Sequence, residues 1–413
     1  MSEPTSEKTG FKSRLLAALL TASGFTIAQI APPPGGPAGP PRPQSVVNAQ
    51  GFGQPLAGLS AAELSAFNDG REEFLNVETP EGGLGPIFNG RSCVECHGVP
   101  TPGGASPINV VRFGRTADGM FDPLDELGGS LLQRFALNPA IRETVPRNAN
   151  TVVERNSTPL FGLGLIEAIP DAAILANAAR GKADGIRGRA ALIVDVVSGE
   201  TRVGRFGWKA QQASVLAFSA DAYNNEMGIT NRFFPHENAP NGNTAAIARF
   251  LRADGELDDV VDANGRGDID LVADYMRLLA APPRLAMSVS AAQGQQVFAN
   301  IGCAACHTPS MTTGRNAVAA LSVKTVGLYS DLLLHDMGSL NDGIAQAGAR
   351  ANEMKTPPLW GLRVTAPYLH DGRAPTVDQA IRAHDGEARI VRDRYGALSP
   401  VQRQQLLDFL NTL

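Results

Sequence analysis

Two short cysteine-containing segments constrain this chain more than any other feature of its sequence. Residues 93–97 read Cys-Val-Glu-Cys-His, and residues 303–307 read Cys-Ala-Ala-Cys-His. A C-x-x-C-H segment is the pattern by which a c-type haem is attached, because two thiols at this spacing reach one edge of a porphyrin. The histidine that follows then lies beneath the iron as its proximal ligand. The sequence therefore predicts two covalently bound haem c groups, attached at Cys93, Cys96, Cys303 and Cys306, with His97 and His307 as iron ligands.

The same cysteines have two other interpretations. A C-x-x-C pair can be a redox-active dithiol or half of a zinc site. Each pair is followed directly by a histidine, which neither alternative explains. The chain contains four cysteines, and the two segments use all of them. None is left for a disulfide or for a cysteine nucleophile, so the di-haem interpretation is preferred.

The composition limits the classes of partner and fold. The chain has 413 residues, of which 19% are charged, and a net charge of −5 without any basic block. Nucleic-acid binding therefore has no support. Glycine (44 residues) and proline (29 residues) are frequent, which favours short helices joined by long ordered loops. We expect a mainly α fold with two cytochrome c-like haem domains.

Residues 1–31 are predicted to be an export signal. Basic residues precede the short apolar run 15–22, which is the order found in secretory signals. The run is too short for a stable membrane span, and a buried helix is the alternative. The Pro/Gly-rich segment 32–54 is predicted to be a linker. Because haem is normally attached outside the cytoplasm, we expect a periplasmic or otherwise exported protein.

Three capping patterns predict helices, because a serine side chain can accept a hydrogen bond from the backbone N–H three residues later. Two of these helices each precede a C-x-x-C-H segment, which is the order of elements in a cytochrome c domain. The predicted helices run from Ser60 to about Leu75, from Ser290 to about Asn300, and onward from Ser399.

An internal repeat supports two haem domains. Residues 274–279 (DYMRLL) are similar to residues 408–413 (DFLNTL), so each half is expected to end in the same kind of helix. We place the boundary after Arg284, which gives domains at 55–284 and 285–413. The first domain is longer, and its insertions, expected to be loops or short helices, are 108–157, 171–203 and 232–267.

One insertion has a spacing like that of a calcium loop. Residues 262–270 carry Asp or Asn at alternate positions, except for Arg266. Ala273 stands where the bidentate glutamate of such a loop belongs. A solvated turn is therefore preferred, and bound calcium has weak support.

Motifs outside the haem segments are similar to those of a known family. Residues 356–360 (TPPLW) and 366–372 (APYLHDG) resemble the bacterial di-haem cytochrome c peroxidase superfamily. Residues 329–338 (YSDLLLHDMG) and 204–210 (GRFGWKA) look more like its di-haem oxidoreductase branch, whose members are described as peroxidases and sometimes as thiol oxidoreductases. The resemblance covers about residues 55–413. The thiol-oxidoreductase label finds no support, since no cysteine is free for dithiol exchange.

The resemblance implies the ligands of the second haem. In the peroxidases, the residue fourteen positions after the PYxHDG histidine is the distal ligand. That histidine is His370 here, and the matching position is His384. Two histidine ligands, His307 and His384, would give a low-spin haem that stores electrons. Met337 and Met354 are rival ligands, and a solvent-facing His384 is the alternative. His370 is expected beside the cofactor, with a hydrogen-bonded core position as its alternative.

The first half carries a less complete copy of the same segment. Aligning Ser214 with Thr376 places Trp208 opposite His370 and Ala222 opposite the distal ligand. Alanine cannot bind iron. By this comparison the first haem keeps an open face.

The first half also resembles the W…EMG segment of the peroxidases. In that segment the tryptophan lies between the haems and the glutamate stands over the reactive iron, and the matching residues here are Trp208 and Glu226. A carboxylate within reach of a peroxide can move a proton from one oxygen to the other, and an indole can bridge an electron path. Glu167, in an apolar run, is a second candidate acid. A core tryptophan and a surface glutamate are the alternatives.

Together these features predict an exported, peroxidase-like di-haem oxidoreductase. Peroxide or another small oxidant would react at the first haem. Electrons from a small redox protein or a quinol-linked donor would pass through the second haem. A non-catalytic di-haem electron carrier is one alternative, and an oxygen-activating or protein-oxidising enzyme is another.

Overall fold

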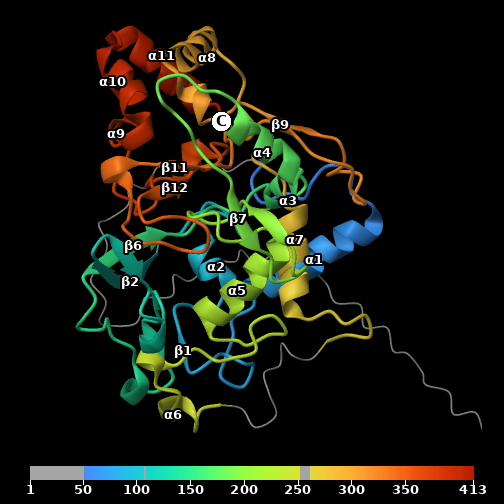
Figure 1. Cartoon of the computed structure of the whole chain (residues 1–413). Coiled ribbons are helices and arrows are strands. Elements are labelled where there is room, and N and C mark those ends of the chain that lie inside the picture. The colour runs from blue at the N-terminus through green and yellow to red at the C-terminus, as the bar shows by residue number, and fades with distance from the viewer. Residues whose placement is uncertain (1–50, 107, 252–260) are drawn as a thin grey trace, which may run out of the picture. The chain divides into compact units, whose positions relative to one another are not determined.

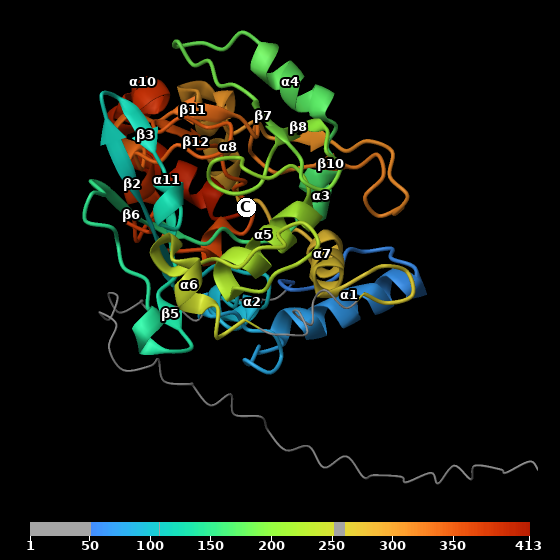
Figure 2. The same cartoon turned by 60° about the horizontal axis from the view of Figure 1, so that its bottom comes forward.

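The computed structural model describes residues 51–106, 108–251 and 261–413. The predicted export signal and nearly all of the predicted linker lie outside these residues. The chain contains both helices and short strands (Figures 1 and 2). The helices are α1 (Ala61–Leu75), α2 (Cys93–Cys96), α3 (Leu163–Glu167), α4 (Asp171–Ala179), α5 (Val215–Met227), α6 (Thr244–Ile247), α7 (Asp268–Leu278), α8 (Val289–Ile301), α9 (Val377–Arg382), α10 (Arg389–Ala397) and α11 (Pro400–Leu410). The strands are β1 (Ile87–Phe88), β2 (Asn109–Ala117), β3 (Met120–Asp122), β4 (Leu131–Leu132), β5 (Phe135–Ala136), β6 (Thr151–Asn156), β7 (Ala191–Val194), β8 (Thr201–Gly204), β9 (Met311–Thr312), β10 (Thr325–Val326), β11 (Leu334–Asp336) and β12 (Glu353–Lys355).

The same helix pair occurs once in each half of the chain. Helix α1 packs against α7, and α8 packs against α11 (Figure 1). In both pairs a glycine lets the two backbones touch. A Cβ atom added at Gly70 would meet the carbonyl of Leu271, and one added at Gly294 would meet the carbonyl of Gln405. The sequence repeat therefore corresponds to a repeated packing arrangement.

Two of the three predicted helix starts, Ser60 and Ser399, are confirmed, and the third, Ser290, is wrong. Ser60 and Ser399 each form a capping box at the start of α1 and α11. The prediction for α8 is wrong by two residues, because Ser288 is its N-cap. Ser290 instead donates a hydrogen bond to Asp408 of α11 at 2.5 Å. Its hydroxyl joins two helices and does not begin one.

The prediction of a mainly α fold is wrong. Of the described residues, 34% are helical and 16% are strand. The insertion 108–157 was expected to be loops or short helices, yet in it β2 pairs antiparallel with β3, β4 and β6. The hairpin β7–β8, residues 191–204, lies almost entirely in the second insertion, 171–203. The valines and threonines of β2 and β6 suit a pleated strand because their branched side chains are restricted in helices. Capping patterns detect helices only, so they did not reveal these runs.

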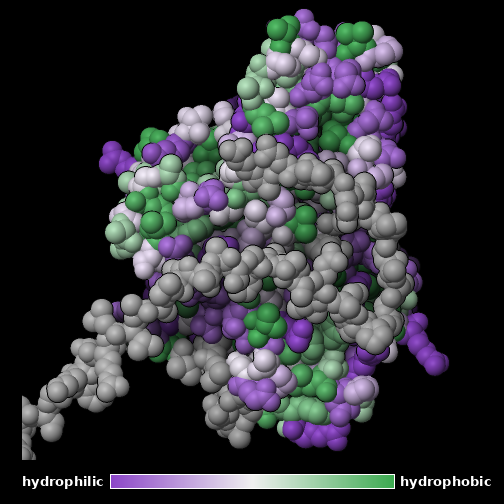
Figure 3. Space-filling model, turned by 180° about the vertical axis from the view of Figure 1, so that it is seen from behind, coloured by the Kyte–Doolittle hydropathy of each residue, from purple (hydrophilic) through white to green (hydrophobic). Residues whose placement is uncertain are grey.

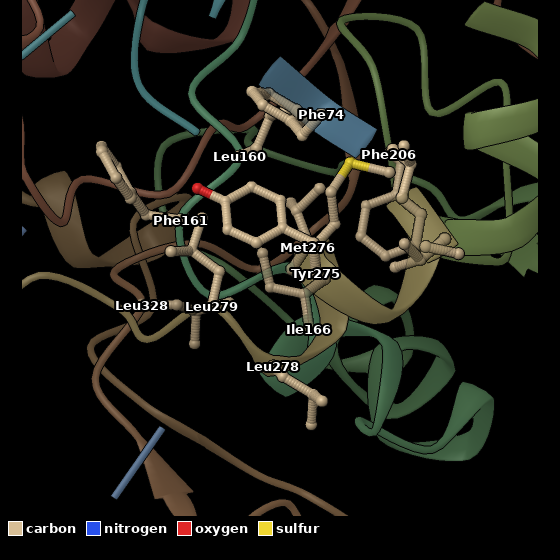
Figure 4. Packing of buried hydrophobic residues seen from close by; sticks show 14 of the residues in the cluster. Phe74, Leu160, Phe161, Ile166, Phe206, Tyr275, Met276, Leu278, Leu279 and Leu328 are labelled. Carbon is tan, nitrogen blue, oxygen red and sulfur yellow. The ribbon is translucent and has the colours of Figure 1, made fainter. Parts of the chain in front are cut away.

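The largest hydrophobic cluster crosses the predicted domain boundary. It brings together Phe74 of α1, Tyr275 of α7 and Phe206, which lie close to one another in Figure 4. The same cluster includes Leu328 and Trp360 from the second half. A smaller cluster lies among α8, α10 and α11. The two halves therefore share much of their apolar interior.

The surface is mixed in character. On the face shown in Figure 3, hydrophilic and hydrophobic side chains are interspersed. Among the described helices, none combines the length and the hydrophobicity that crossing a bilayer requires.

A buried glutamate, Glu78, lies just after the end of α1 near two half-buried acids. Glu78 is 7% exposed and accepts a hydrogen bond from the Asn76 side chain at 2.8 Å. Burial, with Glu73 and Asp268 nearby, raises the pKa of Glu78 to about 7, although the bond from Asn76 acts in the opposite direction. The folded protein therefore holds a proton on Glu78 more tightly than the unfolded chain does.

We expect Glu78→Gln to stabilise the protein at pH 8 and to change its stability little at pH 4. The folded-state pKa lies above the ordinary value of 4.5, so the stability contributed by protonated Glu78 is complete below that pH. It is lost as the pH rises to about 7. At roughly 1.4 kcal/mol per pKa unit, the gain at pH 8 is at most about 3.5 kcal/mol. Thermal unfolding at both pH values measures it, with the exposed Glu72→Gln as control. Equal behaviour of the two variants would contradict the assignment.

Candidate haem sites

The second C-x-x-C-H segment follows directly from the end of α8. Gly302 ends the helix with a left-handed backbone, φ 102°, and the N–H of His307 donates to the carbonyl of Cys303 at 2.9 Å. Nδ1 of His307 lies 3.0 Å from the carbonyl oxygen of Tyr329. A proton on Nδ1 used there leaves Nε2 free to bind a metal, which is how histidine ligands are usually oriented. Burial, and then the neighbouring His384, lower the pKa of His307 to about 4, so its imidazole is neutral.

His384 lies opposite His307. Thr376 caps α9 through a side-chain bond from the Gln379 N–H, and His384 follows just after this helix. The two imidazole ring centres are 6.4 Å apart at an interplanar angle of 56°. Two imidazoles that bind one metal at about 2 Å would have centres about 6 Å apart. Nδ1 of His384 lies 2.8 Å from the carbonyl of Ala380, which again leaves Nε2 free. Burial lowers the pKa of His384.

An apolar cavity extends from this pair of histidines toward the first half. Met337 and Met354, the two rival ligands, also line this cavity. The side chain that faces the ring of His307 is that of His384. The four cysteines form no disulfide. Free thiols at one edge, two oriented imidazoles and apolar walls fit a haem. Around the histidine pair the walls include Phe298, Leu359, Leu362, Ile381, Leu406 and Leu410.

The first C-x-x-C-H segment has the same local geometry. It forms the short helix α2, and the N–H of His97 donates to the carbonyl of Cys93 at 2.9 Å. Nδ1 of His97 lies 3.3 Å from the carbonyl of Gly104. Burial lowers the pKa of His97 to about 4, although the backbones of Gly104 and Thr158 oppose the change. The segment thus offers a second neutral, oriented imidazole.

An aromatic ring lies beside the proximal histidine in each half. Phe74 of α1 and His97 have ring centres 6.5 Å apart at 53°. Phe298 of α8 and His307 also have ring centres 6.5 Å apart at 53°. The proximal sides of the two sites are therefore built alike.

The opposite sides of the two sites differ. Ser214 caps α5 as Thr376 caps α9, in agreement with the sequence alignment of these segments. By that alignment Ala222 of α5, which has only a methyl side chain, corresponds to His384. Among the described residues, no second imidazole pairs with His97 as His384 pairs with His307. Phe206 and Phe218, whose rings stack at 6.2 Å, line the cavity that holds the histidine pair.

Glu226 lies near the first site, at the end of α5. Its carboxylate accepts a hydrogen bond from the Asn89 side chain at 3.0 Å, and its backbone carbonyl accepts from the N–H of Asn89 at 2.7 Å. Burial raises the pKa of Glu226, while Arg112 and Asn89 oppose the rise. Burial raises the pKa of Cys96 to about 12, and Glu226 is the largest charged contributor to that rise. The Glu226 side chain is therefore close to the first C-x-x-C-H segment. Its raised pKa means that burial favours the protonated carboxyl group of Glu226.

Two further charged residues, not predicted from the sequence, lie beside Glu226. Asp221 lies about one turn earlier on α5, and burial raises its pKa while Arg112 opposes the rise. Arg112 comes from β2 and lies near both carboxylates. Asp221 and Glu226 are five residues apart, which is not a same-face spacing on a helix, so the sequence pattern gave no sign that the two acids lie in one cluster. The role of Arg112 depends on the strand pairing, which the sequence analysis did not predict.

Trp208 and His370 meet between the two halves. Their ring centres are 6.3 Å apart in an edge-to-face arrangement of 76°. The indole N–H of Trp208 donates to the carbonyl of Asn156 at 2.7 Å, and the N–H of Asn156 donates to the carbonyl of His370 at 2.6 Å. Burial lowers the pKa of His370 to about 4, although Asp371 opposes this. His370 lines the cavity but is not part of the His307–His384 pair.

Glu167 has a structural explanation. One carboxylate oxygen accepts from the N–H of Val215, the first residue of α5, at 2.7 Å. The other oxygen pairs with Arg277 of α7 at 2.7 Å. Glu167 therefore holds α3, α5 and α7 together, and both oxygens are already engaged.

The segment that carries His384 is fixed by a buried charged group. His335, 1% exposed, lies 3.0 Å from a carboxylate oxygen of Asp331 and 2.8 Å from one of Glu387. Burial opposes protonation of His335, but its hydrogen bonds to Asp331, Cys306 and Glu387 raise its pKa to about 11. Glu387 also accepts from the N–H groups of Arg187 and Gly188, at 2.9 and 3.1 Å. Residues of the first half thus help to hold the segment after His384.

The calcium-like segment forms an exposed turn. The carboxylate of Asp262 accepts from the N–H groups of Asn264 and Arg266 at 2.7 and 3.0 Å. These bonds lower the pKa of Asp262. They account for the residue spacing without a metal.

An oriented histidine and two free thiols in each C-x-x-C-H segment, with an apolar cavity at the second, describe a protein that can hold two haems. A family model described as "di-haem oxidoreductase, putative peroxidase" matches residues 141–413. The chain therefore belongs to the di-haem oxidoreductase family, as its motifs predicted. The match includes the second C-x-x-C-H segment and begins after the first.

The chain is also similar to individual proteins. It is 26% identical to the cytochrome c peroxidase Ccp of Escherichia coli (strain K12) over 129 residues, which are 29% of this chain and 27% of that protein. The chain thus spans about a quarter of the length of this relative. Among solved structures, hydrazine synthase from Kuenenia stuttgartiensis matches with 15% identity and a TM-score of 0.40, over 97% of this chain and 100% of that chain. The diheme peroxidase BthA from Burkholderia thailandensis matches with 13% identity and a TM-score of 0.39, over 84% and 86%.

Proposed function

We propose that this family member binds two covalently attached haem c groups and reduces peroxide at the first. The observation that carries the proposal is the difference between the two sites. His307 faces a second imidazole at 6.4 Å between ring centres, whereas Ala222 corresponds to that imidazole in the first site. When bound, the haems would supply the electrons and the metal site that peroxide reduction requires. A small oxidant could bind only to an iron that has a protein ligand on one side, as proposed for the iron held by His97.

Glu226 is proposed to handle the proton. Reduction of a peroxide needs a proton moved to the leaving oxygen, and a carboxylate with a raised pKa can release one and take it back. Asn89 orients the Glu226 carboxylate through its 3.0 Å hydrogen bond. Arg112 and Asp221 set the local charge. The residues of this cluster are thus equipped for proton transfer near the first C-x-x-C-H segment.

Trp208 is proposed to connect the two sites. Its ring lies against His370 at the junction of the halves and lines the cavity that reaches His307 and His384. The hydrogen bond to Asn156 fixes its orientation. An aromatic ring held in this position is suited to pass electrons between the halves.

The proposal includes export and an electron donor. The sequence pattern of residues 1–31 and the attachment chemistry support a periplasmic or otherwise exported protein. The donor would be a small redox protein or a quinol-linked donor, and the oxidant peroxide or another small molecule.

We expect the oxidised holoprotein to show one high-spin and one low-spin haem by electron paramagnetic resonance. Cyanide or peroxide should change the high-spin signal and leave the low-spin signal in place, because only one site offers an open position. Absorbance titrations on the same sample provide the matched measurement. Two low-spin signals and no response to either ligand would indicate an electron carrier and would overturn the peroxidase assignment.

A further inference from the structure

Two lysines are buried at the junction of the halves, and one of them has its charge fully compensated. Lys209, next to Trp208, has a side chain that is 0% exposed and lies 2.9 Å from a carboxylate oxygen of Asp342. It also donates to the carbonyls of Ala351 at 3.1 Å and Glu353 at 2.5 Å. An ammonium group has three donors, so the hydrogen-bonding capacity of Lys209 is used.

The second lysine lacks such compensation. Lys355, at the end of β12, is 5% exposed. Among the described residues its Nζ has one hydrogen-bond acceptor, the carbonyl of Thr356 at 3.4 Å. Its backbone N–H donates to the carbonyl of Trp208 at 2.8 Å, so the position of the residue is well fixed. A buried ammonium with one weak acceptor is costly unless something else binds it.

Asp331, the carboxylate whose charge acts on Lys355, already has other partners. Asp331 is the one charged group that opposes the fall in pKa of Lys355 caused by burial. It pairs with Lys182 at 2.6 Å and with His335 at 3.0 Å, and it accepts from the N–H of Leu333 at 3.0 Å. Asp331 therefore cannot serve as the direct partner of Lys355.

Lys355 differs in this respect from the other cations that line the cavity. Among the described residues, the cavity lining contains Arg205, Arg392 and Lys355 as its lysine and arginine side chains. Arg205 pairs with Asp171, and Arg392 lies 3.3 Å from a carboxylate oxygen of Asp385. Within the part of the chain that the structure describes, Lys355 has no carboxylate partner, although it lines the same cavity as His307 and His384.

We propose that Lys355 binds a propionate group of a haem held in this cavity. The cavity walls are mostly apolar, as a porphyrin requires, and the propionates are the anionic groups of that cofactor. An ammonium that is buried, fixed in place and lacking a carboxylate is a suitable partner for a carboxylate that arrives with the ligand. The inference rests on the proposed placement of haem in the cavity and is independent of whether peroxide is the substrate.

The proposal has a measurable redox consequence. A reduced haem carries one positive charge less than an oxidised haem, so a nearby cation favours reduction. Removing that cation should lower the midpoint potential of the haem concerned. It should also raise the pKa of its propionate by about one to three units, because an adjacent cation depresses the pKa of a carboxyl group by that amount. The pH at which the midpoint potential changes, which follows the pKa of the propionate, would therefore be higher.

Spectroelectrochemical titration of the holoprotein from pH 5 to pH 9 tests the proposal. In Lys355→Gln we expect one haem to be reduced less easily by about tenfold at pH 7, equivalent to about 59 mV for one electron, and its pH-dependent step to move upward. Lys355→Arg should keep the parent behaviour. The control is Lys324→Gln, which removes the same charge from an exposed residue.

Unchanged potentials of both haems in Lys355→Gln at every pH, with two haems bound, would overturn the proposal. A measurement on the parent protein covers the case in which the variant does not assemble. The propionate bending modes in its resonance Raman spectrum should shift in D₂O, since an N–H donor would exchange. Absence of any such shift would also overturn it. Neither measurement uses peroxide turnover, so failure here is distinct from failure of the proposed function.

Discussion

Replacing His384 by alanine is expected to convert the low-spin haem of the holoprotein to a high-spin one. The ring of His384 lies 6.4 Å from that of His307, and its Nδ1 is already used by the carbonyl of Ala380. The variant loses the imidazole while the His307 side, oriented by Tyr329, is unchanged. Electron paramagnetic resonance and absorbance spectra of the oxidised protein measure the conversion, and added imidazole should restore the low-spin signal.

The control for this experiment is His236→Ala. His236 is exposed, and the structure shows its backbone carbonyl, rather than its ring, accepting a hydrogen bond from Asn224 at 3.0 Å. That variant should keep the parent spectrum. A low-spin signal that survives in His384→Ala but disappears in Met337→Ala or Met354→Ala would assign the ligand to a thioether. Both methionines line the cavity, so the comparison is a direct one.

Replacing Glu226 by glutamine is expected to reduce peroxide turnover by about 10²- to 10⁴-fold, the usual contribution of a positioned acid–base group. Glutamine has the same shape and can still accept the hydrogen bond from Asn89. It cannot hold or release the proton. The high-spin and low-spin signals should therefore remain while the rate of peroxide consumption falls, measured with a reduced electron donor in excess.

Glu167→Gln is the matched control, because Glu167 is the other candidate acid. Its oxygens bind the N–H of Val215 and the guanidinium of Arg277, so we expect lower thermal stability with turnover within a few-fold of the parent. Loss of turnover in Glu167→Gln with normal turnover in Glu226→Gln would exchange the two assignments. Normal turnover in both variants would remove the carboxylate from the proposed reaction.

Local patterns in the sequence predicted the parts of the fold that depend on neighbouring residues. The capping boxes at Ser60 and Ser399 involve residues three positions apart, and both are present. The distance from His370 to His384 is fixed by a short loop and α9, so the alignment could identify the residue opposite His307. The family was recognised from such motifs as well.

Features that depend on distant residues could not be predicted in this way. The pairing of β2 with β6 joins residues about forty positions apart, and capping patterns contain no information about it. The choice of Ser288 over Ser290 as N-cap follows from the contact of Ser290 with Asp408 in α11. Lys355 appears ordinary in sequence, and its lack of a carboxylate becomes visible only when the partners of Asp331 are known.

The attachment of the His384 segment to the first half affects how this chain could be divided. Residues 184–188 hold that segment through Glu387 and through an ion pair at 2.6 Å between Asp184 and Arg394. A fragment comprising only residues 285–413 would keep the α8–α11 pair and its proximal histidine. It would lose the contacts that Glu387 and Arg394 make with residues 184–188. The segment that carries His384 would then be held less firmly, so the position of His384 opposite His307 depends on residues of the first half.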